Sequence, residues 1–355
     1  LIGKKIKELD KERNESVRSI TELTNDGRAI KAICKRLQEW MPKDGEIQGD
    51  QRKLLPIKCV HEMQEVGGRE GMTSFVCDDN GKESHKFLLR NLSLAPMESA
   101  ALFEFFGHMK NLQFLQILDC TLEQSAYLDL ANLLKKNNKI EGLAIRNCGT
   151  SDDDAKHIID ALGNENCKVT HLDLAYNKLL VKSASHLCDA LQSSSCKLTE
   201  LNLNKNKPIG ENLFIYPLTD LGAKYLSKSL TSSECKLTKL FLSGNALSNT
   251  SAKYLRDALI SGNCKLTELN LNDNMLTGAG VECLSEALMS GECKLTKLFL
   301  SGNKLSDAAA ECLRDVLKSG NCKLTELNLN NNILTDVGVE CLSEALMSGE
   351  CKLTK

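Results

Sequence analysis

The sequence predicts an α/β solenoid, a horseshoe-like array with a parallel sheet along its inside and helices along its outside. Two observations predict this fold. Leucines and an asparagine recur in the frame Leu-x-x-Leu-x-Leu-x-x-Asn, which runs from Leu266 to Asn274. The frame returns every 29 residues in the C-terminal half of the chain, ending at Asn245, Asn274, Asn303 and Asn332. A period of this length is typical of solenoids, in which each unit buries its apolar face only against its neighbours.

Each repeat is predicted to contain a strand, a loop, a helix and a second loop. After Asn274, apolar residues recur with helical spacing from Val281 to Leu288. Thr277 is placed to cap the start of this helix, and Gly291 lies just beyond its end. The template asparagine follows the strand, where the chain bends and leaves backbone groups unpaired. We therefore expect these asparagines to belong to the scaffold and not to a ligand site.

The repeats are predicted to occupy residues 84–355, after a short helical segment over residues 1–83. Nine repeats and the start of a tenth can be counted from the template position. One repeat is ten residues longer than the others, with the insertion near residues 207–216. The chain ends inside a repeat, at Lys355, so we expect it to be a fragment of a longer protein.

Charge and cysteine content argue against several classes of function. The net charge is −2, from 45 basic and 47 acidic residues, which gives no indication of binding to nucleic acid or to an anionic membrane. No apolar run is long enough to cross a bilayer. The 16 cysteines contain no CxxC pair and no His/Cys metal spacing, so no metal site is predicted. Several recur at one repeat position, as Cys235, Cys264 and Cys293 do, which favours buried, reduced thiols and a cytoplasmic location.

No motif indicates an enzyme. The six histidines fit neither HExxH nor a nucleophile motif, and nothing matches the phosphate-binding loop GxxxxGK[ST]. We therefore predict no catalytic residue and no cofactor for these 355 residues. The acidic run from Asp152 to Asp154 is predicted to start a helix, where the helix dipole favours acidic side chains.

The residues between the strand leucines are expected to face the concave side of the solenoid. One such position is predicted to form a ladder of alternating, attracting charges, at Glu200, Lys239, Glu268, Lys297, Glu326 and Lys355. Exposed pairs of this kind contribute only about 0.2–1 kcal/mol each, so the ladder is expected mainly to hold the sheet in register. The functional alternative is that Phe241 and Phe299, exposed between polar strands, are anchors for a protein or peptide, because aromatic residues in recessed surfaces are typical hot spots.

The candidate ligand contacts therefore include residues of alternate strands and two residues of the insertion. They are Phe241, Phe299, Lys239, Lys297 and Glu268 on the strands, and Phe214 and Tyr216 in the insertion. Loops on one side of a solenoid often carry binding residues, and three consecutive apolar residues are unusual for a solvated loop. The sequence leaves open whether Phe214 and Tyr216 contact a ligand or pack over the neighbouring repeat.

Helix-bearing repeats of 28 and 29 residues, alternating in pairs with Cys-Lys-Leu before the strand, resemble ribonuclease-inhibitor-type leucine-rich repeats. They are particularly similar to the C-terminal arrays of NACHT-type nucleotide-binding leucine-rich-repeat receptors (NLRs). The segment from Leu54 to Glu65 resembles the helical stretch that precedes the repeats in those receptors. The resemblance covers about residues 84–355 for the repeats and about residues 30–83 for the helical stretch.

The resemblance implies a non-enzymatic module that senses ligands or restrains activity in an intracellular innate immune receptor. It also implies an upstream nucleotide-binding domain in the same polypeptide and a protein or microbial ligand on the concave face. Two alternatives stay open, a free-standing binding protein or adaptor similar to the ribonuclease inhibitor, and a GTPase activator of the RanGAP type. Alternating charges argue against the strongly acidic face that would suit an inhibitor of a basic nuclease, and no distinctive match supports the GTPase activator.

Overall fold

The structure is a computed structural model that describes residues 45–49, 51–55, 57–58, 85–109, 111–136, 139–206 and 218–355. The chain divides into two compact units, Leu1–Ile140 and Glu141–Lys355. The insertion near 207–216, with Phe214 and Tyr216, lies outside the described residues, as does most of the predicted helical segment.

The described part of the first unit contains three parallel strands that pair side by side. They are β1 (Glu46–Gln48), β2 (Lys86–Arg90) and β4 (Phe114–Leu118), and the short strands β3 (Ser93–Leu94) and β5 (Thr121–Leu122) pair separately. A 3-10 turn, η1 (Gln51–Leu54), follows β1, and helices α6 (Pro96–His108) and α7 (Gln124–Lys136) follow the later strands. Phe87 packs edge-on against Phe106 in the core, with ring centroids 4.7 Å apart.

Strand β1 was not predicted from the sequence. Its three residues do not carry the leucine frame, yet Ile47 is fully buried where β1 pairs with β2. A strand therefore precedes the first predicted repeat, inside the segment expected to be helical.

The second unit contains a parallel sheet whose described strands pair in sequence order. They are β6 (Gly142–Arg146), β7 (His171–Asp173), β8 (Glu200–Asn202), β9 (Lys239–Phe241), β10 (Glu268–Asn270), β11 (Lys297–Phe299) and β12 (Glu326–Asn328). Each residue faces its counterpart in the next repeat, so Leu240 lies between Leu201 and Leu269. This register places equivalent side chains in rows that run across the strands.

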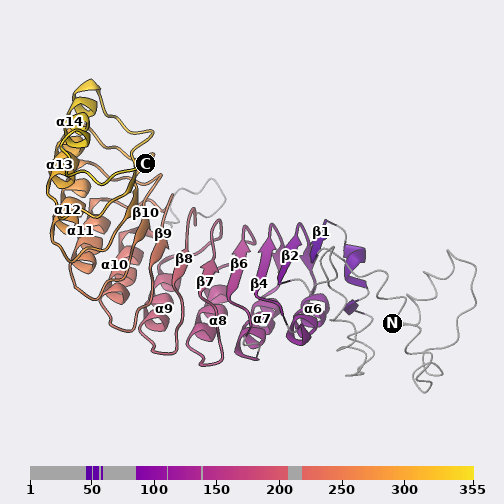
Figure 1. Cartoon of the computed structure of the whole chain (residues 1–355). Helices are drawn as coiled ribbons and strands as arrows, with labels where there is room; N and C mark the ends of the chain where they lie inside the picture. The colour runs from indigo at the N-terminus through magenta and orange to yellow at the C-terminus, as the bar shows by residue number, and fades with distance from the viewer. Residues whose placement is uncertain are drawn as a thin grey trace, which may run out of the picture. The chain divides into compact units, whose positions relative to one another are not determined.

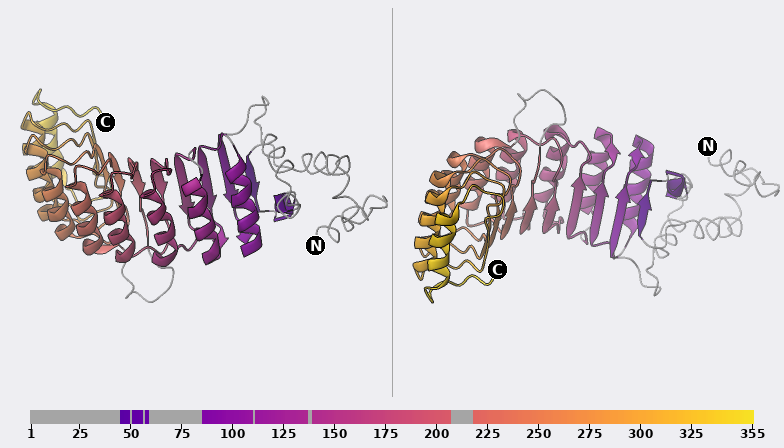
Figure 2. Two further views of the ribbon diagram at one scale, coloured as in Figure 1. Left: turned by 90° about the horizontal axis from the view of Figure 1, so that it is seen from below. Right: turned by 90° about the horizontal axis from the view of Figure 1, so that it is seen from above.

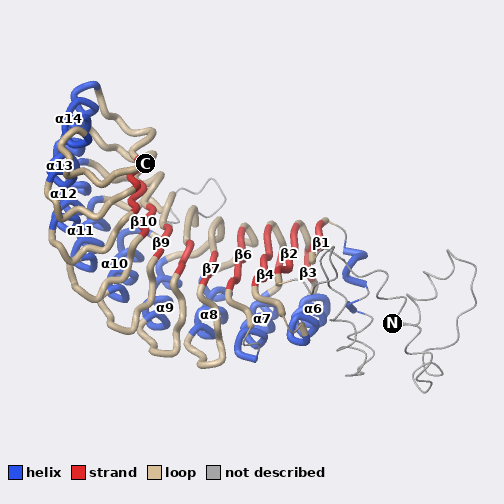
Figure 3. The backbone as a smooth tube through the Cα atoms, in the orientation of Figure 1, coloured by secondary structure: helices blue, strands red, loops and turns tan. Residues whose placement is uncertain are grey.

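One helix follows each strand of the second unit. The helices are α8 (Asp152–Leu162), α9 (Val181–Leu191), α10 (Thr219–Leu230), α11 (Asn249–Leu259), α12 (Gly278–Met289), α13 (Asp307–Lys318) and α14 (Asp336–Leu346). Within this unit the helices lie on the outer side of the curve and the strands on the inner side (Figures 1 and 3). The helices form a single row (Figure 2). The predicted α/β solenoid is confirmed.

The core of the second unit lies between the sheet and the helices. The strand leucines, such as Leu269 and Leu271, are fully buried, and Val281 and Leu288 cover them from α12. The cysteines that precede each strand are buried too, and burial raises the pKa of the Cys264 thiol to about 11, so this thiol stays protonated at neutral pH. In the helices the pattern is looser, because Cys312 and Cys341 are only half-buried.

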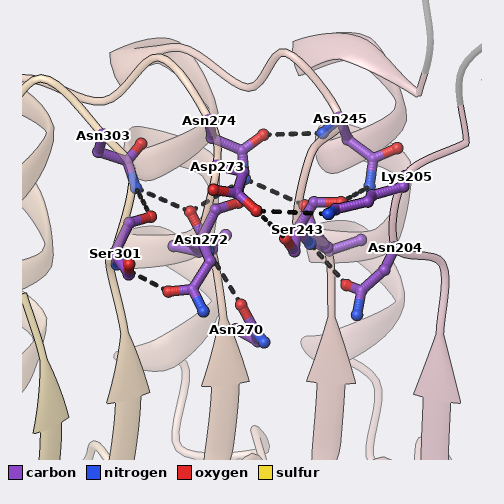
Figure 4. Close-up of polar contacts among 12 residues, drawn as sticks. Asn204, Lys205, Ser243, Asn245, Asn270, Asn272, Asp273, Asn274, Ser301 and Asn303 are labelled. Carbon is purple, nitrogen blue, oxygen red and sulfur yellow. Dashed lines mark hydrogen bonds and ion pairs between the residues drawn. The ribbon is translucent and has the colours of Figure 1, made fainter. Parts of the chain in front are cut away.

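The template asparagines connect neighbouring repeats (Figure 4). The Asn274 side-chain oxygen accepts hydrogen bonds from the backbone amides of Asn245 and Leu247 in the preceding repeat, both at 3.0 Å. Its amide nitrogen donates to the carbonyls of Leu242 and Leu271, also at 3.0 Å. Asn274 is 6 % exposed, so these bonds satisfy polar backbone groups that water does not reach. The prediction that these asparagines are scaffold residues is confirmed.

Polar residues at the helix starts form a second set of links between repeats. Thr277 stands at the N-cap of α12 as predicted, but its hydroxyl accepts a hydrogen bond from Asn249 of the preceding helix, at 2.8 Å, and does not cap its own helix. Asp220 of α10 accepts hydrogen bonds from the amide and hydroxyl of Ser248, at 2.8 and 2.5 Å, and from the hydroxyl of Ser251. The first turn of one helix thus holds the first turn of the next.

The Asp220 link predicts a loss of stability in acid. Burial raises the pKa of Asp220, but the hydrogen bonds from Ser248 and Ser251 more than offset burial, so the pKa lies below its usual value. A carboxylate with a lowered pKa in the folded state stabilises the fold above its unfolded pKa of about 3.9, and this stability is lost as the pH falls through the folded pKa. We expect Asp220→Asn to lower the urea midpoint clearly at pH 7 and by a smaller amount at about pH 3, where this stability is already being lost.

The matched control for this prediction is Asp189→Asn. Asp189 is exposed on α9 and accepts no hydrogen bond among the described residues, so its substitution should change the midpoint little at either pH. An Asp220→Asn effect of equal size at both pH values would show that the carboxylate charge is not what stabilises this link.

Candidate functional site

The strand face of the second unit is the candidate binding surface. We define it as the side chains that alternate with the buried strand leucines on β7 to β12, together with the residues just beyond the strand ends. The parallel register arranges these side chains in rows across the sheet. Three rows make up this surface: a charged row, an aromatic row and a polar row at the ends of the strands.

The charged row contains the predicted ladder. Lys239 pairs with Glu200 at 3.0 Å, and Glu326 pairs with both Lys297, at 3.3 Å, and Lys355, at 2.9 Å. The hydrogen bond that Lys239 donates to Glu200 raises the pKa of Lys239, and the one that Glu326 accepts from Lys355 lowers the pKa of Glu326. These shifts keep both groups charged at neutral pH, as the prediction of attracting neighbours requires.

Glu268 departs from this pattern. It lies in register between Lys239 and Lys297, but both ammonium groups form their ion pairs on the far side, with Glu200 and Glu326. Glu268 forms no ion pair with any residue that the structure describes. The charged row therefore has at its centre a carboxylate that forms no such ion pair, although its charge helps to raise the pKa of Lys239.

The aromatic row places Phe241 and Phe299 on alternate strands, with Asn270 in register between them. Both rings are half-buried, whereas the sequence suggested that they are exposed. Their backbone lies in a strand flanked by side chains of neighbouring strands, which cover part of each ring. A ring that is half accessible can still contact a partner.

A hydrogen-bond pattern explains why phenylalanine occurs on every second strand. On the polar strands, the Asn270 side chain accepts a hydrogen bond from the amide of Asn272 at 2.9 Å. Phenylalanine cannot do this, and on β11 the amide of Ser301 instead donates to the side chain of Asn272 on the neighbouring strand, at 2.7 Å. The side chain of Asn204 accepts a hydrogen bond from the amide of Ser243 in the same way, at 2.6 Å. Side chains of the polar strands thus accept the hydrogen bonds of backbone amides in the neighbouring repeats. Positions 241 and 299 do not have to provide this acceptor and can carry an aromatic ring.

The sequence analysis missed a polar cluster at the ends of the strands (Figure 4). The Asp273 carboxylate accepts a hydrogen bond from Ser243 at 3.3 Å and lies 3.8 Å from the ammonium group of Lys205, two repeats away. Residues at this repeat position have left-handed backbone conformation, and Gly244 and Gly302 adopt it with φ values of 68° and 67°. A Cβ on Gly244 would lie 2.8 Å from the Lys205 side chain. Glycine on alternate repeats makes room for the long side chains between them.

The alternation of Gly with Lys, Asp or Asn just before the template asparagine is the sequence signal for this cluster.

Tyr176 occupies the same position one repeat before Lys205, and it is 43 % exposed. Arg146 and Lys205 lie over its ring, with the charged groups 5.5 and 5.8 Å from the centroid. Both contacts fall within the usual range of cation–π interactions.

No group of three or more His, Cys, Asp or Glu side chains among the described residues could hold a metal ion. None of the described helices is both long and apolar enough to span a bilayer.

Comparisons with known proteins identify the repeats. Five segments match the family model described as "Leucine Rich repeat", at residues 165–183, 194–211, 262–285, 292–313 and 320–343. The chain carries a leucine-rich-repeat array. The array is similar to "NACHT, LRR and PYD domains-containing protein 14" of Homo sapiens, with 36% identity over 76 residues. The match covers 21% of this chain and 7% of that protein, so the chain corresponds to a small part of its relative. These matches confirm the predicted resemblance to the repeat array of an NLR-type receptor.

Two solved structures are also similar to the leucine-rich-repeat array. One is an internalin (inlF) from Listeria monocytogenes, with 16% identity, coverage of 92% of this chain and 95% of the internalin, and a TM-score of 0.42. The other is a TLR13–ssRNA13 complex, with 18% identity, coverage of 73% and 37%, and a TM-score of 0.36. At these scores and identities neither similarity bears on function.

Arrays of this family are typically protein-interaction modules and not enzymes. The structure brings Lys239, Glu268, Lys297, Phe241 and Phe299 together on the strand face. Their role as ligand contacts stays a prediction, and so does that of Phe214 and Tyr216.

Proposed function

We propose that the leucine-rich-repeat array is the ligand-sensing and autoregulatory module of an intracellular NLR-like innate immune receptor. It acts without catalysis, by binding a protein or a microbial ligand on the strand face, in the cytoplasm. A nucleotide-binding domain upstream in the same polypeptide would respond to this binding, as the name of the human relative suggests through its NACHT domain. The full-length reading frame tests this last point, because a GxxxxGK[ST] motif upstream of the array would support it.

The observation that carries the binding role is the pair of accessible phenylalanines on the strand face. The sheet gives Phe241 and Phe299 no structural task that a polar residue could not perform, because Asn202, Asn270 and Asn328 occupy the equivalent positions on the other strands. Aromatic side chains that remain accessible in a polar surface are typical of binding hot spots.

The double variant Phe241→Ser/Phe299→Ser tests the proposed function. We expect proteins captured from a cell lysate by the wild-type chain to be reduced by at least about tenfold with the variant, because each lost hot spot costs about 2 kcal/mol or more. Each substitution should lower the free energy of unfolding by only about 1 kcal/mol, because half of each ring is already accessible. Quantitative mass spectrometry of the captured proteins and urea denaturation measure the two effects.

The control variant for this experiment is Met289→Ser, which removes an apolar side chain that is 38 % exposed at the end of α12, on the helix side of the array. It should leave capture unchanged. Loss of capture by both variants would indicate non-specific apolar binding, and a large loss of stability in the Phe variant would assign the rings to the core.

A further inference from the structure

The spacing of Phe241 and Phe299 restricts the shape of a partner that contacts both rings. They lie at equivalent positions of β9 and β11, with one strand between them. Neighbouring strands of a sheet lie about 4.8 Å apart, so the two anchors are separated by about 10 Å across the strands. A partner must present two apolar groups with this separation on one face.

An α-helix has this separation and an extended strand does not. Residues i and i+7 of a helix lie about 10.5 Å apart along the axis and on the same face, because seven residues make almost two turns. In an extended strand, side chains on one face repeat about every 6.8 Å, so the separations available are about 7 and 14 Å. The geometry therefore favours a helix that lies across the strands.

The charge between the rings restricts the partner further. Glu268 lies on β10, between the two aromatic strands, and it is the acidic residue of the charged row that forms no ion pair with a described residue. On a helix anchored at i and i+7, residues i+3 and i+4 lie midway between the anchors and on the same face. These positions lie over Asn270, which is in register with both rings, and Glu268 lies two residues before it, about 7 Å away along β10. A long basic side chain, lysine or arginine, at one of these positions would extend along the strand toward Glu268.

We propose that the strand face binds an amphipathic α-helix of a partner protein, with apolar residues at i and i+7 on Phe241 and Phe299 and a basic residue at i+3 or i+4 opposite Glu268. This inference rests on the proposed binding role of the strand face and adds the chemistry of the partner. It also gives the two-repeat alternation a function: the polar strands supply the acid and the backbone support, and the aromatic strands supply the anchors.

Synthetic helical peptides of about 20 residues, long enough to form stable helix, test the proposal. The matching peptide carries Leu at i and i+7 and Arg at i+3, in an alanine- and glutamine-rich background with a fluorescent label. The register control moves the second Leu to i+5, which lies on another side of the helix, and leaves the composition unchanged. Fluorescence anisotropy with the whole 355-residue chain measures the affinity of each peptide.

We expect the matching peptide to bind at least about tenfold more tightly than the register control, and Phe241→Ser to remove this difference. Glu268→Lys should weaken the Arg peptide and strengthen a peptide with Glu at i+3. Glu282→Lys, the same change of charge at an exposed position of α12, should alter neither affinity. Circular dichroism of each variant confirms that the fold is retained.

Equal binding of the matching and register peptides, or binding that survives Phe241→Ser, would overturn the proposal. Absence of peptide binding, while proteins captured from the lysate still depend on the two phenylalanines, would show that the strand face binds a partner that is not such a helix. Absence of both effects would reject the proposed function together with this inference.

Discussion

Asn274→Ala is expected to lower the free energy of unfolding by about 3–5 kcal/mol. The substitution removes the acceptor for the backbone amides of Asn245 and Leu247 and the donor to the carbonyls of Leu242 and Leu271. Each buried polar group that loses its partner costs about 1–3 kcal/mol. Urea denaturation followed by circular dichroism measures the effect.

The same substitution in the ninth repeat is the matched control. The side-chain oxygen of Asn332 accepts a hydrogen bond from one backbone amide, that of Leu305, at 3.1 Å. Asn332 is half-buried, so water can reach the backbone groups that lose their partner when its side chain is removed. We expect Asn332→Ala to cost about 1–2 kcal/mol. Equal losses for the two variants would mean that burial and the second accepted amide add little to the stabilisation, since Asn332 also bonds to Leu300 and Leu305 of the preceding repeat.

The scaffold could be predicted from the sequence because it repeats. A side chain that performs the same structural task in every unit, as the leucines and Asn274 do, appears in the sequence at a fixed period. Burial and the hydrogen bonds of the bend after each strand explain why leucine and asparagine recur at these positions in the C-terminal repeats. Strand β1 was missed for the complementary reason, since Ile47 is buried by a strand that lacks the repeat frame.

The candidate site could be predicted only in part. Register follows from the period, so the position of Glu268 between two lysines was predictable. The lack of an ion pair at Glu268 could not be predicted, because Lys239 and Lys297 can each reach an acidic residue on either side. The side-chain rotamers of the two lysines decide which acidic residue each one pairs with. The Lys205–Asp273 contact spans two repeats across a glycine, a separation that nearest-neighbour reasoning about strands does not consider.

Leu288→Ala is expected to destabilise the protein by about 2–5 kcal/mol, as does removal of other fully buried leucines. Leu288 is 2 % exposed and packs between α12 and the sheet, and the following repeat covers it. The truncated side chain would leave a cavity that a close-packed layer of leucines fills only partly. The chain offers an internal control, because residues 281–297 and 339–355 have identical sequences.

Leu346 is the counterpart of Leu288 in this duplicated segment, and it is 58 % exposed on α14. The local sequence and helix propensity are the same, so the two substitutions differ mainly in what covers the side chain. We expect Leu346→Ala to cost less than about 1 kcal/mol, because little apolar surface returns to water. Parallel urea denaturation of the two variants at several protein concentrations measures the difference.

Equal losses would contradict the view that contacts between neighbouring repeats, and not the structure within each repeat, provide most of the stability. Such contacts are the reason that a solenoid gains stability with each added repeat.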